Sequence, residues 1–303
     1  HGVHHGVALH HVEAGEEVAD DVVAHVAHVQ VAGRVGVHVE AVVLGLVGVA
    51  LDVEEAMLGP VRLPGGFDGV ELSLLSAGQI EYARLESLLA EYGLKVYGIA
   101  TGQSYYAEGI SLFAPDRAIR DRAIEKLREH VDLACDLDAA VIVGGIRGRL
   151  PSEPHASSLS AGWDAFRDVA QYACGKNVTI LLEPINRYET NIVNTLEQGA
   201  EIIRKLAFPN VRLLADAFHM NIEDDSIAGS LIQAGPAIGY MHLADSNRRA
   251  PGQGHLNLPD VVMTLATLGY DWYVTAEILP RPDPDTAAAA AIGYLRQIVP
   301  GRA

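Results

Sequence analysis

The chain has 303 residues, 49% of them hydrophobic, and a formal net charge of −17 at pH 7. This size suits one large α/β domain or two smaller ones, and the acidic balance argues against a nucleic acid partner. The longest apolar run near the start, residues 41–51, is too short to span a membrane. Two cysteines, Cys135 and Cys174, make no disulfide framework, so we expect a cytoplasmic protein without a membrane partner.

The first 66 residues differ in composition from the rest of the chain. Residues 1–60 contain no Ser, Thr, Asn, Lys, Ile, Phe, Tyr, Trp or Cys, and every amino acid there except Met57 has codons that begin with G or C. A GC-rich gene carries G or C at most third codon positions, so a shifted reading frame would produce this composition. We therefore interpret residues 1–66 as a wrong-frame translation outside the fold, joined to the true frame between Gly59 and Phe67.

Two other interpretations of this first segment remain open. Eight of the thirteen histidines lie in it, so it could be a metal-binding tract or a low-complexity tail. The groups HGVHH (residues 1–5) and LHHVE (residues 9–13) have side chains that bind metals, but nothing in the sequence fixes their geometry.

From Phe67 onward, strand-like and helix-like segments alternate. Seven short runs rich in β-branched and aliphatic residues are each followed by a helical segment. The predicted strands are 69–73, 95–101, 139–145, 178–183, 211–216, 238–244 and 273–278, and the predicted helices are 78–93, 115–137, 160–174, 195–207, 225–233, 258–269 and 285–298.

Seven βα units predict an α/β fold of the (β/α)8 TIM barrel type whose first unit is missing or scrambled. The missing unit would precede residue 67, where the anomalous segment lies. No G-x-G-x-x-G fingerprint opens any of the predicted helices, so a nucleotide-binding doubly wound sheet has weak support. Because no Pro/Gly/Ser-rich linker divides residues 67–303, we expect a single domain there, and its assembly into a homo-oligomer is left open.

The ends of the last four predicted strands carry Glu183, Asp216, His242 and Glu277. In a TIM barrel the chemistry takes place at the carboxyl ends of the strands, and neighbouring strands lie about 4.8 Å apart. These four side chains can therefore meet, and three carboxylates gathered at one point would repel one another without a cation. Three carboxylates and one imidazole suit Mn²⁺, Mg²⁺ or Co²⁺. The alternative is that each is a buried polar group with its own local partner.

Four motifs carry a family resemblance. They are LLEPINRYETN (181–191), LLADAFHMNIEDD (213–225), MHLADSNRRAPGQGH (241–255) and VTAEIL (274–279). Together they resemble the ketose 3-epimerase branch of the xylose isomerase-like TIM barrel superfamily, which includes D-tagatose 3-epimerase, D-psicose 3-epimerase and 5-keto-L-gluconate epimerase. The resemblance extends from about residue 67 to the C-terminus and is most specific over residues 183–277.

The resemblance implies a metal-dependent isomerase that epimerises a ketose or keto sugar acid at C3 through a cis-enediolate. Glu183, Asp216, His242 and Glu277 would bind the ion, with Mn²⁺ expected first. Glu183 and Glu277 would also be the catalytic residues, one removing the C3 proton and the other returning a proton to the opposite face.

The same resemblance implies that Glu189, His219 and Arg248 contact the substrate. His219 and Arg248 would stabilise the charge that develops on the C2 oxygen, and Glu189 would accept a hydrogen bond from a sugar hydroxyl. Each has a plainer interpretation, because His219 could cap a turn, Glu189 could pair with Arg187, and Arg248 could lie on a solvated loop.

Residues at two further strand ends concern the kind of substrate that the site would bind. Arg147 in GGIRGR (144–149) would bind the carboxylate of an acidic keto sugar if it faces the site, and otherwise reaches outward to a surface acid. Gln103 in ATGQSYY (100–106) would help to line the pocket.

Rival functions remain open. Hydroxypyruvate isomerase and inosose dehydratase belong to the same superfamily and use similar ligands. The endonuclease IV relatives use a His-rich trinuclear cluster and a basic groove, which the acidic balance disfavours. A non-catalytic sugar-binding barrel is the remaining alternative, should the missing first unit disrupt the pocket.

Overall fold

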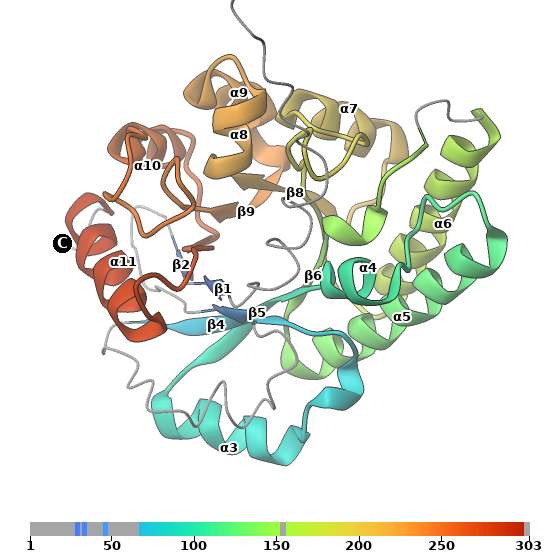
Figure 1. Cartoon of the computed structure of the whole chain (residues 1–303), viewed down its shortest axis with the longest axis horizontal. Helices are drawn as coiled ribbons and strands as arrows, with labels where there is room; N and C mark the ends of the chain where they lie inside the picture. The colour runs from blue at the N-terminus through green and yellow to red at the C-terminus, as the bar shows by residue number, and fades with distance from the viewer. Residues whose placement is uncertain (1–27, 31, 35–44, 48–66, 152–155, 300–303) are drawn as a thin grey trace, which may run out of the picture.

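The computed structural model describes residues 28–30, 32–34, 45–47, 67–151 and 156–299. Seven parallel strands, each paired with the next in chain order, curve into a nearly closed barrel with helices around the outside (Figure 1). This confirms the predicted TIM barrel. The strands are β4 (Gly69–Ser73), β5 (Lys95–Ala100), β6 (Ala140–Val143), β7 (Ile180–Leu182), β8 (Val211–Asp216), β9 (Ile238–His242) and β10 (Tyr273–Thr275).

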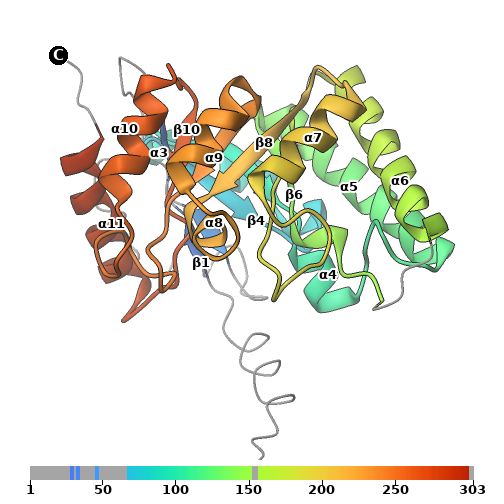
Figure 2. The ribbon, with the colours of Figure 1, turned by 90° about the horizontal axis from the view of Figure 1, so that it is seen from above.

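The helices surround the sheet in the order that the sequence predicts, with two short additions (Figure 2). Of the additions, α8 directly follows the end of β8, and α4 begins three residues after the end of β5. Neither was predicted, because six or seven residues give too short a pattern. The helices are α3 (Tyr82–Tyr92), α4 (Gln103–Glu108), α5 (Arg117–Leu137), α6 (Ala156–Gly175), α7 (Leu196–Leu206), α8 (Ala217–Glu223), α9 (Ile227–Ala234), α10 (Leu258–Thr267) and α11 (Pro284–Ile298).

Helix boundaries follow local side-chain chemistry. At the start of α5 the Asp116 carboxylate accepts a hydrogen bond from the Ala118 N–H, and at the start of α7 Thr195 and Gln198 form a capping box. The α3 helix ends at Gly93, whose φ of 65° is a left-handed conformation that glycine adopts without strain.

The gap between β4 and β10 is flanked by three short strands from the anomalous segment. β3 (Gly45–Val47) pairs parallel to β4, β2 (Ala32–Arg34) pairs antiparallel to β10, and β1 (His28–Gln30) pairs antiparallel to β3. A regular barrel has one parallel strand and its helix at this place. The described strands therefore match a missing or scrambled first unit. The proposed wrong-frame origin of residues 1–66 stays a prediction, and most of them lie outside the described residues.

The apolar residues form two layers. Along β7, Ile180 and Leu182 pack outward in the large cluster between strands and helices, whereas Leu181 packs inward with Ile142 and Tyr240 in a small cluster inside the barrel. Burial on both faces explains the unbroken apolar run of this strand. The inner cluster is the apolar part of the barrel interior, which also holds the buried carboxylate of Glu71.

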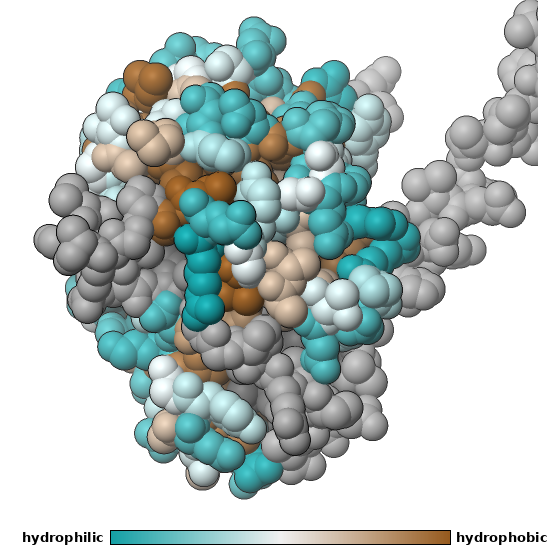
Figure 3. Space-filling view, turned by 90° about the vertical axis from the view of Figure 1, so that its left-hand side faces the viewer, coloured by the Kyte–Doolittle hydropathy of each residue, from teal (hydrophilic) through white to brown (hydrophobic). Residues whose placement is uncertain are grey.

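The outer surface mixes residue types. Figure 3 shows hydrophobic residues interspersed with hydrophilic ones on the side of the molecule where α10 and α11 lie. Within the described part of the chain, no helix has the length and apolar character that crossing a membrane requires.

Candidate metal centre

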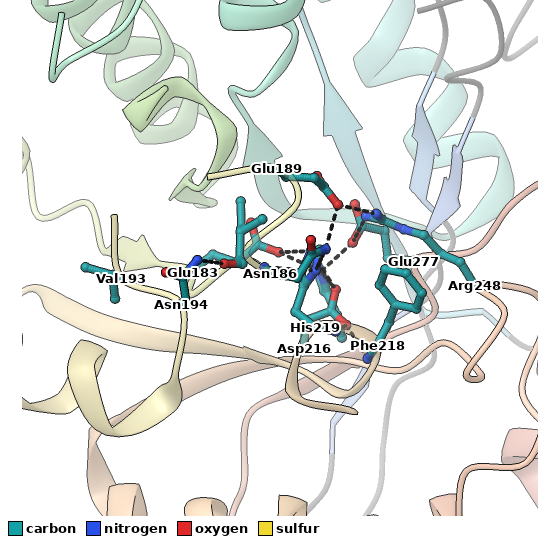
Figure 4. Close-up of polar contacts among 12 residues, drawn as sticks. Glu183, Asn186, Glu189, Val193, Asn194, Asp216, Phe218, His219, Arg248 and Glu277 are labelled. Atoms are coloured by element: carbon teal, nitrogen blue, oxygen red, sulfur yellow. Dashed lines mark hydrogen bonds and ion pairs between the residues drawn. The ribbon is translucent and has the colours of Figure 1, made fainter. Parts of the chain in front are cut away.

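Four side chains from four neighbouring strands lie together at one end of the barrel. Glu183 follows β7, Asp216 ends β8, His242 ends β9, and Glu277 lies two residues beyond β10. One candidate ligand atom from each lies within 4.8 Å of the others. The first three side chains are buried and the fourth is half-buried. The structure thus brings together all four positions that the sequence nominates, which we call the ligand cluster, and Figure 4 shows its three carboxylates.

The electrostatics of the ligand cluster fit a cation. Nδ1 of His242 lies 3.2 Å from Oε2 of Glu277, 3.7 Å from Oδ2 of Asp216 and 3.8 Å from Oε1 of Glu183. Oδ2 of Asp216 is buried and accepts no hydrogen bond from the described residues. Burial, and then the neighbouring carboxylate of Glu277, raises the pKa of Glu183 well above its usual value. Buried carboxylates with an unpaired oxygen are stabilised by a divalent ion that prefers oxygen and nitrogen ligands.

The other ring nitrogen of His242 contacts a residue that the sequence analysis missed. Nε2 lies 3.0 Å from Oε2 of Glu71, a fully buried residue of β4. Burial alone would lower the pKa of His242, but Glu71 and Glu277 raise it well above its usual value. Burial also raises the pKa of Glu71, partly offset by His242. The alternation of side chains along a strand could have revealed Glu71. Val70 and Leu72 face outward, so the acid between them faces the barrel interior.

His219 lies beside the ligand cluster in a fixed orientation. Its Nε2 is 3.8 Å from Oδ2 of Asp216, and its Nδ1 is 2.8 Å from Nδ2 of Asn186. The Asn186 amide is oriented by two further bonds, since its Oδ1 accepts from the Tyr188 N–H at 3.0 Å and its Nδ2 donates to Glu189 at 2.8 Å. Nδ1 of His219 therefore accepts, which assigns the proton of the neutral ring to Nε2, directed toward the ligand cluster.

Arg248 connects the ligand cluster to Glu189. One guanidinium nitrogen donates to Glu277 at 3.1 Å and another to Glu189 at 3.4 Å. The guanidinium also lies 4.9 Å from the centre of the Phe218 ring, a cation–π distance. Glu189 in turn accepts a hydrogen bond from the Tyr106 hydroxyl at 3.1 Å. The predicted contacts Glu189, His219 and Arg248 thus border the ligand cluster, as Figure 4 shows.

The guanidinium of Arg147 is directed toward backbone carbonyls, whereas binding of a substrate carboxylate would require it to face the site. Its side chain is fully buried, and its guanidinium donates to the backbone carbonyls of Val143, Glu183 and Val193. Burial lowers its pKa to about 10. The guanidinium therefore holds the backbone at the end of β7, and no described contact supports the predicted role in binding a substrate carboxylate.

Gln103 lies at the start of α4, beside the end of β4. Its Nε2 donates to the carbonyl of Ser73 at 3.1 Å, and the side chain is half-buried. This bond ties α4 to the neighbouring strand end. The expectation that Gln103 lines a substrate pocket stays a prediction.

Comparison with known proteins gives the family. The family model described as "Xylose isomerase-like TIM barrel" matches residues 65–298. The chain belongs to this family. The resemblance inferred from the four motifs is therefore confirmed, and the match begins beside the boundary predicted at residue 67.

Several members of known activity are similar along most of their length. L-ribulose 3-epimerase from Methylomonas sp. (strain DH-1) is 32% identical over 231 residues, which cover 75% of this chain and 79% of that protein. 3-Dehydro-D-guloside 4-epimerase from Escherichia coli (strain K12) is 30% identical over 242 residues, 76% of this chain and 90% of that protein. A crystal structure of D-allulose 3-epimerase from Methylomonas sp. in complex with D-allulose superposes with a TM-score of 0.71 at 28% identity, covering 81% of this chain and 90% of that one.

Proposed function

We propose that this protein is a divalent-metal-dependent epimerase that inverts C3 of a ketose through a cis-enediolate of the sugar. The observation that carries the proposal is the ligand cluster of Glu183, Asp216, His242 and Glu277 at the carboxyl ends of neighbouring strands. Relatives of about 30% identity are ketose 3-epimerases, which supports the same class of reaction here.

The ligand cluster would hold one ion. Mn²⁺ is the first candidate and Mg²⁺ or Co²⁺ the alternatives, because the donors are carboxylate oxygens and an imidazole without a thiolate. When bound, such an ion supplies Lewis acidity that stabilises negative charge on the sugar oxygens.

Glu183 and Glu277 would move the protons. They extend from β7 and β10, the two outer strands of the four that carry the ligand cluster. One carboxylate removes the proton from C3, and the other delivers a proton to the opposite face, which inverts the carbon. Glu183 is buried within the ligand cluster, so a proton held there is shielded from bulk water.

His219 and Arg248 would stabilise the charge that forms on the C2 oxygen. The Nε2–H of His219 is directed toward the ligand cluster because Nδ1 accepts a hydrogen bond from the side-chain amide of Asn186. Arg248 donates hydrogen bonds to both Glu277 and Glu189. It would therefore fix the position of Glu277, which moves a proton, relative to Glu189, which accepts a hydrogen bond from a sugar hydroxyl. Glu189 would then accept a hydrogen bond from a sugar hydroxyl.

A neutral ketose fits this site better than a keto sugar acid, because the Arg147 guanidinium is engaged by backbone carbonyls. Hydroxypyruvate isomerase and inosose dehydratase activities remain the alternatives, since the same ligand cluster would serve them. The cytoplasmic location and homo-oligomeric assembly stay predictions.

The test is proton exchange at C3. The Mn²⁺-loaded protein is incubated in D₂O with D-allulose, D-tagatose, D-fructose, L-ribulose, 5-keto-gluconate and hydroxypyruvate, and deuterium incorporation is followed by NMR. We expect deuterium at C3 together with the C3 epimer for at least one ketose. Turnover of hydroxypyruvate alone would favour the isomerase, and absence of exchange with every compound would contradict the proposal.

A further inference from the structure

Glu71 sits in the middle of β4 with its side chain inside the barrel. Val70 and Leu72 on either side belong to the outer apolar cluster, whereas the Glu71 side chain is fully buried on the inner face. The pairing of β4 with β5 shifts at this point, because Val70 is opposite Val96 and Glu71 is opposite Gly98. An irregularity of this kind, a β-bulge, redirects a side chain beside it.

Gly98 provides the space that the carboxylate occupies. A Cβ atom at position 98 would lie 3.1 Å from Cγ of Glu71 and 3.3 Å from its Oε2, closer than ordinary contact. The bulge and the glycine together accommodate a charged group in the barrel interior. Burying a carboxylate there is costly unless it has a partner.

The partner of Glu71 is the metal-ligand candidate His242. Oε2 of Glu71 lies 3.0 Å from Nε2 of His242, across 171 residues of sequence, while Nδ1 of the same ring faces the ligand cluster, 3.2 Å from Oε2 of Glu277. An imidazole binds a metal only through a nitrogen that carries no proton. For Nδ1 to bind the ion, the ring proton must lie on Nε2. The Nε2–H then donates a hydrogen bond to the Glu71 carboxylate.

We infer that Glu71 is a positioning residue that holds His242 as the Nε2–H tautomer and aims Nδ1 at the ion. This inference rests on the proposed metal-dependent function. A carboxylate behind a histidine ligand also increases the electron density of the ring and so strengthens the metal bond. Glu71 would act through His242, because it is not one of the four side chains of the ligand cluster.

The first test is the Mn²⁺ affinity of the purified full chain, measured by calorimetry without substrate. Glu71→Leu, which removes the acceptor, is expected to weaken binding about 10- to 100-fold. Glu71→Gln keeps one acceptor oxygen and should lose less. The matched control is Asp68→Asn, an acid adjoining the opposite end of the same strand, which should bind Mn²⁺ like the wild type. Wild-type affinity in both folded Glu71 variants would overturn the inference.

The second test uses the wild-type chain and is independent of whether the variants fold. The ¹⁵N spectrum of the Zn²⁺-loaded protein is expected to show the His242 proton on Nε2 and the metal on Nδ1. A proton on Nδ1, or a metal on Nε2, would overturn the inference. If the wild type binds Mn²⁺ and both folded variants bind it equally, only the role of Glu71 fails; if the wild type binds none, the proposed function fails as well.

Discussion

The half of the barrel formed by β7 to β10 differs in role from the half formed by β4 to β6. The first half carries the ligand cluster at its strand ends. The second half supplies groups that contact this cluster, since Glu71 of β4 bonds His242, and Arg147 beyond β6 bonds the carbonyl of Glu183. The proposed reacting groups thus lie at the strand ends of one half, and the other half adds two contacts that orient them, beside those of Asn186 and Arg248 in the first half.

Glu183→Gln removes a reacting group from the first half and should have the largest effect. The amide is not a base and has lost the charge that attracts a cation, so we expect the rate of C3 exchange to fall by about 10³-fold or more. The rate is measured by deuterium incorporation at saturating Mn²⁺. Glu201→Gln, on the exposed surface of α7, is the control and should retain the wild-type rate. A Glu183→Gln rate within tenfold of wild type would contradict the assignment.

Asn186→Leu alters orientation within the first half without removing a reacting group. It removes the side-chain hydrogen bonds to His219 and Glu189 and leaves Nδ1 of His219 only the longer bond, 3.5 Å, from the backbone N–H of residue 186, so the Nε2–H tautomer is held less firmly. We expect kcat to fall about 10- to 100-fold, less than the loss of a whole charge-stabilising donor. The ¹⁵N spectrum of His219 should show a mixture of tautomers. An unchanged kcat with a single Nε2–H tautomer would refute the role of Asn186.

Arg147→Met removes a guanidinium of the second half that bonds the backbone at the end of β7. Three buried carbonyls lose a charged donor, and those of Val143 and Val193 keep a backbone N–H donor, so the free energy of unfolding should fall by about 3 kcal/mol, as measured by urea denaturation. Any loss of kcat/KM should be equal for neutral and acidic keto sugars. Selective loss of the acidic substrates would restore the carboxylate-binding role that the sequence suggested.

Asp68→Asn tests a position remote from the ligand cluster and should have the smallest effect. Burial raises the pKa of Asp68 to about 6, with Arg296 opposing the shift. Because the folded chain holds this proton more tightly than the unfolded chain, the contribution of Asp68 to stability falls as pH rises from about 4 to about 6. The variant should therefore match the wild type near pH 4 and be more stable at pH 7.

The expected gain for Asp68→Asn is about 1 kcal/mol or less, because the side chain is half-buried and water screens its charge. Thermal unfolding at both pH values measures it. A gain that is larger at pH 4 than at pH 7 would contradict the sign of the pKa shift.

Much of the fold was predictable because each strand is a short apolar run followed by a helical pattern. The exceptions were α4 and α8, whose first turns depend on strand-end geometry more than on periodicity. In α8, for example, the Asp216 side chain accepts from the Phe218 N–H at 2.7 Å. A ligand at a strand end thus also caps the helix that follows, which residue patterns alone do not reveal.

The ligand cluster was predictable because strand ends in a barrel converge. The residues that orient it were not, because they act through contacts between distant positions of the chain. Glu71 meets His242 across 171 residues, and Asn186 meets His219 across 33. Arg147 does stand at a strand end, but the short turn Gly145–Arg147 carries its guanidinium back toward the backbone of β7. The sequence therefore places Arg147 correctly at the end of a strand, but it does not reveal the direction in which the guanidinium points.

We propose that one divalent ion is held by Glu183, Asp216, His242 and Glu277. Anomalous diffraction from crystals grown with Mn²⁺ tests it most directly, because the scattering locates the metal independently of any activity. We expect one Mn²⁺ per chain in contact with all four side chains, with Nδ1 of His242 as the nitrogen ligand. Mn²⁺ bound elsewhere, or a crystal in which these four side chains point apart, would contradict it.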